Sequence, residues 1–515
     1  MAFHLTNIGN VSDDATLELD GAGRVATAIA GTTTYLFVVG FTDDGVSVFS
    51  VAADGTLTNV DNVTDDGTVV LNGPDGVTTA VVAGTPYLFV SSISESGVSV
   101  FSVAADGTLT NVDNVTDTGA LELSGATGLA TAEIGGTTFL FVAGNSDDGV
   151  NVFAVADDGT LASVETVNDD AIVELDAATS VATAVIAGTA YLFVAGIADD
   201  GVSVFSVAAD GALTNVDNVT DDVVLALDGA NGVTTAVVAG TTYLFVASFF
   251  DRGVSVFSVA ADGTLTNVDN VSDDGTLQLA GAIGVTTAVI DGTTYLFVTG
   301  NVDRGLSVFE VAADGTLTNV ANVADDATMQ LFGVVGVANA AVGGTHYLFA
   351  AGNTDDGVSV FTPTGDIPLL GDVLWQHADG TVAIADHELP AVLGGFRIAE
   401  TGDFDGDGDS DIVWRHTEGD VVTWELENGD FLAAHSLPDV AITFQIAGTG
   451  DFDRDGDDDI LWRHDEGLNV IWEMEDGALV TNHNLLWFRT ASRWRASAIS
   501  TVTAMTTSCG ATTRA

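Results

Sequence analysis

An internal repeat of 52 residues constrains the fold of this chain more than any other feature. The tetrad Tyr-Leu-Phe-Val, with small variations, begins at residues 35, 87, 139, 191, 243, 295 and 347, so seven copies follow one another at one spacing. Each copy predicts four short strands, which in the second copy are 77–83, 87–91, 98–104 and 109–115. Asp-Gly pairs such as Asp106-Gly107 are hairpin signals. Seven equal units of four strands predict an all-β fold.

The two ends of the repeat array predict a closed ring. Residues 5–14 match the fourth strand of a unit, as in 109–117, but they precede the first complete unit. The seventh unit stops after its third strand, at 358–362. The N-terminal strand can therefore complete the last sheet and leave no open edge at the seam. We predict a seven-bladed β-propeller over residues 1–365.

A resemblance to known propellers accompanies the repeat. Units such as residues 191–214 resemble those of lactonase-type seven-bladed propellers and related bacterial surface propellers. The lactonase relatives would imply hydrolysis of a sugar lactone at the mouth of the ring. No catalytic residue of that family can be matched onto a position here, and the sequence contains no Gly-x-Ser-x-Gly, phosphate-binding loop or Cys-x-x-Cys motif. We therefore assign no catalytic and no cofactor-binding residue.

The charge balance excludes several classes of partner. The chain has 74 Asp and Glu against 11 cationic residues, all of them Arg, for a net charge of −63. So acidic a chain repels nucleic acids and anionic bilayers. A hydrophobic content of 47% excludes an acidic disordered tail. No apolar run reaches the roughly 18 residues of a membrane span. We expect a monomer with neither nucleic-acid binding nor membrane insertion.

The loops that differ most between units lie on one face of the predicted ring. Arg252 and Arg304 occupy the same loop position in adjacent units, beside Phe249 and Phe250. These four residues form a candidate ligand site, with the Arg side chains as an anion clamp and the Phe rings as a stacking platform. The alternative is that each Arg pairs with a neighbouring Asp. The acidic loops themselves either collect divalent cations or keep a salt-adapted protein soluble.

Two segments after the repeat array have the pattern of a calcium loop. Both fit Asp-x-Asp-x-Asp-Gly-x-x-Asp, in which closely spaced carboxylates converge on one hard cation and the Gly allows a sharp turn. So many carboxylates within nine residues would repel one another without a cation. The candidate calcium ligands are Asp403, Asp405, Asp407, Asp409 and Asp411 in the first loop, and Asp451, Asp453, Asp455, Asp457 and Asp459 in the second.

These segments resemble the FG-GAP/VCBS repeats, the calcium-loop blades also found in integrin α-chains. By that resemblance Asp409 and Asp457 would act through backbone oxygens, and residues 366–485 would form a partial second propeller-type module. Arg454 departs from the usual small residue at its position and could lower the affinity of the second loop. An earlier partial copy, at 374–380, keeps the Trp-x-His-x-x-Gly signature without an Asp loop before it.

The last residues, 486–515, follow no repeat. With GC-rich codons, a shifted reading frame of residues 496–515 encodes a third loop similar to 449–467. We interpret 486–515 as a frameshifted tail, so that Cys509 is an artefact and the intended protein continued further.

The N-terminus, the Cys content and the predicted calcium loops together indicate a function outside the cell. The N-terminal residues have neither the basic nor the apolar region of a signal peptide, so we expect none. Cys509 is the single Cys of the sequence, and the predicted calcium loops suit millimolar extracellular calcium. We expect a secreted, calcium-binding repeat protein, exported without an N-terminal signal, that acts as a binding or adhesion module for an extracellular ligand or surface. The alternatives are a lactonase-like hydrolase and a structural spacer or matrix protein, so enzymatic activity is left open.

Overall fold

The computed structural model describes residues 3–485, with gaps at 15, 171, 291, 327, 366–373, 377–381, 385–386, 390–395, 407–410, 428–429, 451, 453–456, 465–466 and 476. The chain divides into two compact units, one spanning His4–Thr364 and one beginning at Gly365. Each unit is described by itself. The interpreted frameshift tail, 486–515, lies outside the described residues.

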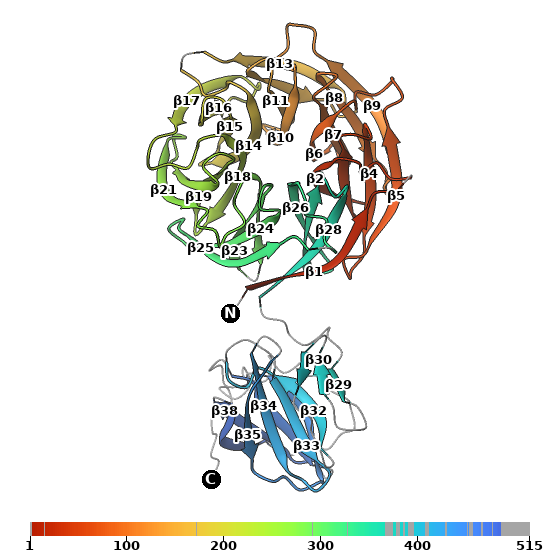
Figure 1. Ribbon diagram of the computed structural model, residues 1–515, viewed down its shortest axis with the longest axis vertical. Coiled ribbons are helices and arrows are strands. Elements are labelled where there is room, and N and C mark those ends of the chain that lie inside the picture. Colours follow the sequence, from red (N-terminus) through yellow and green to blue (C-terminus); the bar gives the residue numbers. More distant parts are fainter. Residues whose placement is uncertain are drawn as a thin grey trace, which may run out of the picture. The chain divides into compact units, whose positions relative to one another are not determined.

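The first unit is a ring of seven four-stranded antiparallel sheets (Figure 1). The first six sheets follow the chain and consist of β2–β5 (Ala22–Ala30, Thr33–Gly40, Gly45–Val51, Leu57–Thr64), β6–β9 (Pro74–Val82, Thr85–Ser92, Gly97–Val103, Leu109–Thr116), β10–β13 (Ala126–Ile134, Thr137–Gly144, Gly149–Val155, Leu161–Asn168), β14–β17 (Ala178–Ile186, Thr189–Gly196, Gly201–Val207, Leu213–Thr220), β18–β21 (Ala230–Val238, Thr241–Ser248, Gly253–Val259, Leu265–Ser272) and β22–β25 (Ala282–Ile290, Thr293–Gly300, Gly305–Val311, Leu317–Ala324).

The seventh sheet joins the two ends of the unit. Its strands are β26 (Val334–Val342), β27 (Thr345–Gly352), β28 (Gly357–Gly365) and β1 (Phe3–Ser12), with β1 paired to β28. The hydrogen bonds at this seam include those from Ser359 Oγ to Asn10 Oδ1 at 2.7 Å and from the Asp13 N–H to the Asp356 carbonyl oxygen at 2.7 Å. The predicted seven-bladed propeller, completed by the N-terminal strand, is confirmed.

The apolar core of this unit lies between neighbouring sheets. The second strand of each sheet is buried on both faces, which explains its nearly continuous apolar sequence. In one interface Tyr35 and Phe37 of β3 pack against Leu88 and Phe101 of the next sheet. The outermost strands, such as β5, contain only half-buried and exposed residues because they lie at the periphery of the ring.

A cycle of hydrogen bonds joins the seven innermost strands. In each sheet one side chain at the same position of the first strand donates to the backbone carbonyl of its counterpart in the preceding sheet. The seven bonds are Thr27 to Asn339 (3.1 Å), Thr79 to Thr27 (3.0 Å), Thr131 to Thr79 (3.2 Å), Thr183 to Thr131 (3.2 Å), Thr235 to Thr183 (3.1 Å), Thr287 to Thr235 (3.5 Å) and Asn339 to Thr287 (3.1 Å). The cycle closes across the seam.

The periphery carries a second tie between sheets. The Tyr35 hydroxyl donates to the Ala105 carbonyl oxygen in the hairpin of the next sheet at 3.0 Å, and the Tyr347 hydroxyl does the same to Ala53 across the seam at 2.8 Å. The hairpin residue Gly107 has φ +88°, and a Cβ there would lie 2.4 Å from the Tyr35 ring. The Asp-Gly signal thus serves both the turn and the packing of the neighbouring Tyr.

One strand begins earlier than predicted. The sequence predicts the first strand of the second unit from Val77, but β6 starts at Pro74, which pairs with Ser92 before a register shift. Proline is tolerated there because it is the first residue of an innermost strand, whose other edge has no ladder partner in the sheet.

The second unit contains three further sheets. A three-stranded sheet is formed by β29 (Leu374–Gln376), β30 (Val382–Ile384) and β31 (His387–Leu389). Two four-stranded sheets follow, β32–β35 (Phe396–Gly402, Asp411–His416, Val421–Glu427, Asp430–Leu437) and β36–β39 (Phe444–Gly450, Asp459–His464, Asn469–Glu475, Ala478–Leu485). Among the described residues, no helix is long and apolar enough to cross a bilayer.

The two four-stranded sheets pack face to face like neighbouring blades. Their shared core contains Phe404, Val413, Trp462 and Trp472. Thr449 Oγ1 donates to the Thr401 carbonyl oxygen at 2.7 Å, which repeats the inter-strand bond of the propeller. The predicted partial propeller-type module therefore has two complete blades in the described residues.

The hydrogen-bond cycle generates a stability prediction. Thr183→Val keeps the shape of the side chain but removes the donor to Thr131, so we expect a loss of about 1 kcal/mol in the free energy of unfolding. Thr183→Ser retains a hydroxyl and serves as the matched control, with a smaller loss. Urea unfolding followed by circular dichroism measures both. Equal losses in the two variants would show that the hydrogen bond does not contribute.

Candidate functional site

Three carboxylates of the first predicted calcium loop converge in the structure. Asp403 and Asp405 follow β32, and Asp411 begins β33, so a tight loop brings its two ends together. One carboxylate oxygen from each of the three residues lies within 4.8 Å of the others, with Asp411 buried and the other two half-buried. Asp407 and Asp409 lie outside the described residues. The sequence pattern thus corresponds to a spatial cluster of oxygen ligands.

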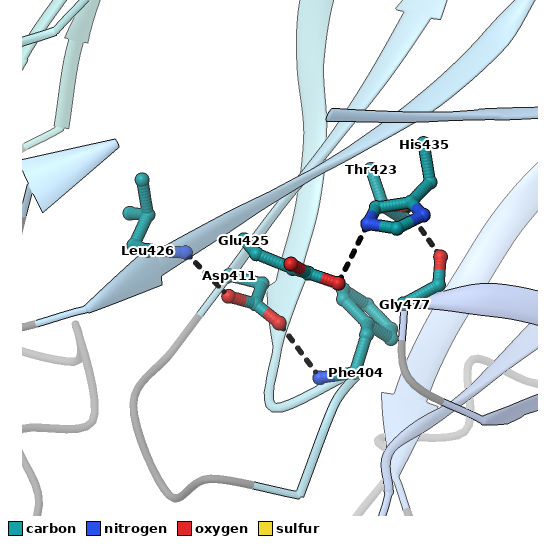
Figure 2. A network of polar contacts seen from close by, with 7 residues as sticks. All are labelled: Phe404, Asp411, Thr423, Glu425, Leu426, His435 and Gly477. Atoms are coloured by element: carbon teal, nitrogen blue, oxygen red, sulfur yellow. Dashed lines mark hydrogen bonds and ion pairs between the residues drawn. The ribbon is translucent and has the colours of Figure 1, made fainter. Parts of the chain in front are cut away.

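Asp411 also organises the backbone around this cluster. Its Oδ2 accepts the Phe404 N–H at 2.9 Å, and its Oδ1 accepts the Leu426 N–H at 2.9 Å (Figure 2). The first bond holds the loop closed, and the second ties it to β34. Because each carboxylate oxygen has more than one acceptor direction, these bonds leave capacity for a cation. Asp411 is therefore both a candidate ligand and a structural anchor.

The second loop repeats this anchor. Asp459 is buried, and its two carboxylate oxygens accept the N–H groups of Phe452 and Met474, each at 3.0 Å. Asp457 is half-buried, and Asp451, Asp453 and Asp455 lie outside the described residues, as does Arg454. The loop's convergence on a cation stays a prediction.

Sequence reasoning missed the contact between the two loops. Asp458 was not singled out, yet its Oδ2 accepts the Asp403 N–H at 3.2 Å and its own N–H donates to the Asp403 carbonyl oxygen. The Gly477 N–H also donates to the Phe404 carbonyl oxygen at 2.8 Å. The first loop is therefore held by the following sheet as well as by its own.

A polar pair beside the loop was also missed, in which Glu425 is buried and His435 is half-buried. His435 Nε2 lies 2.7 Å from Glu425 Oε1, and Thr423 Oγ1 donates to the Gly477 carbonyl oxygen at 2.7 Å (Figure 2). The pair recurs 48 residues later, where His483 Nε2 lies 2.5 Å from Glu473 Oε1. That recurrence in the sequence could have revealed the pair, which connects adjacent strands and points to a structural role.

The donor set suits a hard divalent cation. Carboxylate oxygens are the ligands that Ca²⁺ prefers, and three of them in a half-buried loop repel one another when no cation is present. A calcium ion would be held by Asp403, Asp405 and Asp411, together with the remaining loop residues. Its chemistry there would be charge neutralisation and cross-linking of the loop.

The candidate ring-face ligand site lies on loops of the propeller. Phe249 and Phe250 form an edge-to-face pair with centroids 5.3 Å apart, and Phe250 is 60% exposed. The Arg304 guanidinium lies over the Phe332 ring, 3.7 Å from its centroid. Both Arg252 and Arg304 are exposed, and no ion pair to a carboxylate is found for either among the described residues. Burial and the Asp355 charge raise the pKa of Asp325, while the charge of Arg304 opposes that shift, so Arg304 does interact with an acidic neighbour. The alternative in which each Arg pairs with a neighbouring Asp therefore stays open beside the ligand site.

The acidic loops of the same face are engaged with backbone donors. Asp43 Oδ2 accepts the Asp20 N–H at 2.9 Å, and Asp44 Oδ1 accepts the Gly73 N–H at 2.8 Å. Within the described part of the chain, the only grouping of three potential metal ligands is the one at Asp403, Asp405 and Asp411. Asp43 and Asp44 thus accept hydrogen bonds from backbone N–H groups of the loops.

Comparisons with known proteins give one family match and several similar solved structures. Residues 403–462 match the model of the FG-GAP-like repeat family. No curated protein matches the chain. Similar solved structures include a periplasmic gluconolactonase from Pseudomonas aeruginosa (19% identity, 58% of this chain and 85% of that chain, TM-score 0.47) and a candidate 6-phosphogluconolactonase from Bacteroides uniformis (17% identity, 61% and 88%, TM-score 0.44). Hydrazine synthase from Kuenenia stuttgartiensis is similar over 69% of this chain and 97% of its own, at 15% identity and TM-score 0.47. At these values nothing about the activity of this chain follows from them.

The acidic face generates a pH prediction at Glu174. Its pKa is raised, first because burial penalises the carboxylate and then because Asp199 and Asp169 repel it, while the Thr220 hydroxyl opposes the shift. A pKa raised by folding means that ionised Glu174 destabilises the native state at neutral pH, and that the penalty disappears below the ordinary Glu pKa. The same position is Gln in two other sheets, Gln278 and Gln330.

We therefore expect Glu174→Gln to stabilise the protein at pH 7 and to lose this advantage as the pH falls below about 4. Midpoints of urea unfolding at both pH values measure the effect. A gain of the same size at both would attribute it to packing instead of charge.

Proposed function

We propose that the chain is a calcium-binding repeat protein whose propeller serves as a binding module for an extracellular ligand. The observation that carries the calcium assignment is the convergence of Asp403, Asp405 and Asp411 within 4.8 Å. The match of residues 403–462 to the FG-GAP-like repeat model supports it.

Calcium would act on stability and order. The cluster lies at the entry to β33, and its anchor Asp411 is bonded to Phe404, whose ring is buried between the two sheets. Neutralising the cluster removes repulsion at the point where the loop, its own sheet and the next sheet meet. Binding energy at such a site becomes folding energy of the unit.

The propeller has the architecture of a display platform. Its sheets are tied together by the inner hydrogen-bond cycle and by the peripheral Tyr hydroxyls, and they present variable loops on one face. Substitutions in such loops alter a binding surface without disturbing the core. This arrangement supports a binding role. The proposal also includes export of the protein, because a calcium-rich medium is needed to fill the calcium site.

Calcium titration tests the assignment. At about 100 times the dissociation constant, calcium should stabilise the second unit by about 2.7 kcal/mol, and sites of this type in extracellular modules bind at about 0.1–1 mM. Asp405→Asn should abolish most of the shift, and in EDTA it should melt at or above the temperature of the wild type because it removes one of the three mutually repelling carboxylates. Thermal unfolding of the full chain, with EDTA and with excess calcium, measures both. An unchanged curve in excess calcium overturns the metal assignment.

Asp411→Asn separates the two roles of that residue. The amide offers one acceptor where the carboxylate offers two, so the N–H of Phe404 or Leu426 loses its partner. We expect a loss of about 1–3 kcal/mol in EDTA as well as a reduced calcium shift. A normal curve in EDTA would show that Asp411 is a ligand without an anchoring role.

A further inference from the structure

At one loop position of the propeller, the side chain forms the same hydrogen bond to the following sheet in most of the seven sheets. The last residue of the loop between the second and third strands accepts a hydrogen bond from a backbone N–H at the start of the next sheet. Carboxylates do this in four sheets, where Asp44 accepts from Gly73 (2.8 Å), Asp148 from Ala177 (2.9 Å), Asp200 from Gly229 (2.8 Å) and Asp356 from Gly21 (2.9 Å). Ser96 does it with its hydroxyl, from Gly125 at 3.3 Å.

Arg252 and Arg304 occupy this position in the two remaining sheets. An Arg side chain has no acceptor, so it cannot receive the hydrogen bond. The corresponding donors are the N–H groups of Gly281 and Gly333, and both residues are buried. Neither N–H has an acceptor among the described residues. A buried N–H without a partner is rare and costly, so these two positions call for an external acceptor.

The surroundings favour a carboxylate as that acceptor. Each orphaned N–H stands where four other sheets hold a carboxylate oxygen at 2.8–2.9 Å. Each also has a guanidinium on the neighbouring loop, and a guanidinium binds carboxylates through paired N–H groups. Carboxylates of the chain add repulsion at both positions. Asp303 accepts the Ala280 N–H at 2.8 Å, and Asp355 accepts the Phe332 N–H at 2.9 Å. Asp325 interacts with both Asp355 and Arg304, so an anion at the second position shares the Arg304 charge with Asp325. The same adjacency of two carboxylates exists at Asp43 and Asp44, so the fold accommodates it.

Aromatic side chains border both positions. The Phe249 ring lies against Gly281, with its Cε2 3.1 Å from where a Cβ would be, and the exposed Phe250 ring continues the surface. At the second position Arg304 is stacked on Phe332, the residue before Gly333. An apolar ring beside an anion site suits the C–H face of a sugar that carries a carboxylate.

We propose that the loop-bearing face of the propeller binds an acidic saccharide at two neighbouring sites. A uronate carboxylate accepts the Gly281 N–H beside Arg252, a second accepts the Gly333 N–H beside Arg304, and Phe249 and Phe250 contact the sugar. This proposal rests on the binding role given above and names the ligand class for it.

The repeat itself supplies the decisive variants. Arg252→Asp and Arg304→Asp restore the carboxylate acceptor found in four other sheets. The new Asp side chains would then accept the Gly281 and Gly333 N–H groups in place of the ligand. Both Arg residues have positive φ, 52° and 58°, a conformation that Asp adopts more readily than Arg. We therefore expect the double variant to fold and to melt at or above the temperature of the wild type. Trigalacturonate should bind it at least about tenfold more weakly.

The measurement is calorimetric titration of the full chain with trigalacturonate. EDTA and 150 mM NaCl are present, so that calcium bridging plays no part and long-range repulsion is screened. Neutral trigalactose is the ligand control and should bind far more weakly. No binding of trigalacturonate, or equal binding by wild type and double variant, overturns the proposal. Binding of a triglutamate peptide in place of trigalacturonate supports the carboxylate site but overturns the saccharide.

A gain-of-site variant gives an independent check. Asp200→Arg removes the acceptor of the Gly229 N–H, which lies under Phe250. We expect one additional uronate site, seen as a raised stoichiometry, and an unchanged stoichiometry contradicts the proposed mechanism. The calcium-dependent melting shift is unaffected in the double variant and in Asp200→Arg if the calcium assignment holds. Failure of the saccharide proposal is thereby distinguishable from failure of the calcium site.

Discussion

The propeller depends on the cyclic tie between its innermost strands. Each Thr hydroxyl in the cycle donates to the preceding sheet, and the last link, from Thr27 to the Asn339 carbonyl oxygen, exists only when the first and seventh sheets are neighbours. The seventh sheet in turn needs β1 from the other end of the chain. Closure of the ring thus completes the inner hydrogen-bond cycle, buries the apolar faces of the first and seventh sheets and pairs the open sheet edge with β1.

The sequence could predict this fold because the repeat is nearly uniform. Uniform spacing gave the number of sheets, and the unmatched strand at 5–14 gave the closure. The strand that starts at Pro74 was not predictable in the same way, because proline argues against a strand unless its place at the edge of a sheet is known. The Thr cycle was hidden as well, since a Thr in an alternating strand carries no sign of which backbone group it will meet.

The candidate sites were predictable only in part, for a related reason. An Asp-rich loop identifies ligands by spacing, and the spacing does place Asp403, Asp405 and Asp411 together. It cannot tell that both oxygens of Asp411 also hold backbone N–H groups, because that depends on how β34 lies beside the loop. The exception at Arg252 and Arg304 was visible by comparing copies, but its meaning required the hydrogen bonds that the other copies make.

The two predicted calcium loops have similar sequences, but they differ in the number of neighbouring sheets that hold them in place. Phe404 in the first loop is fully buried, and its carbonyl oxygen accepts the Gly477 N–H of the next sheet. Phe452, its counterpart in the second loop, is half-buried, and no further sheet packs on it among the described residues. A loop held on both sides loses less conformational entropy when a cation binds. By this argument the first Asp-rich loop is better preorganised for a cation than the second, because it is held by its own sheet and by the next one.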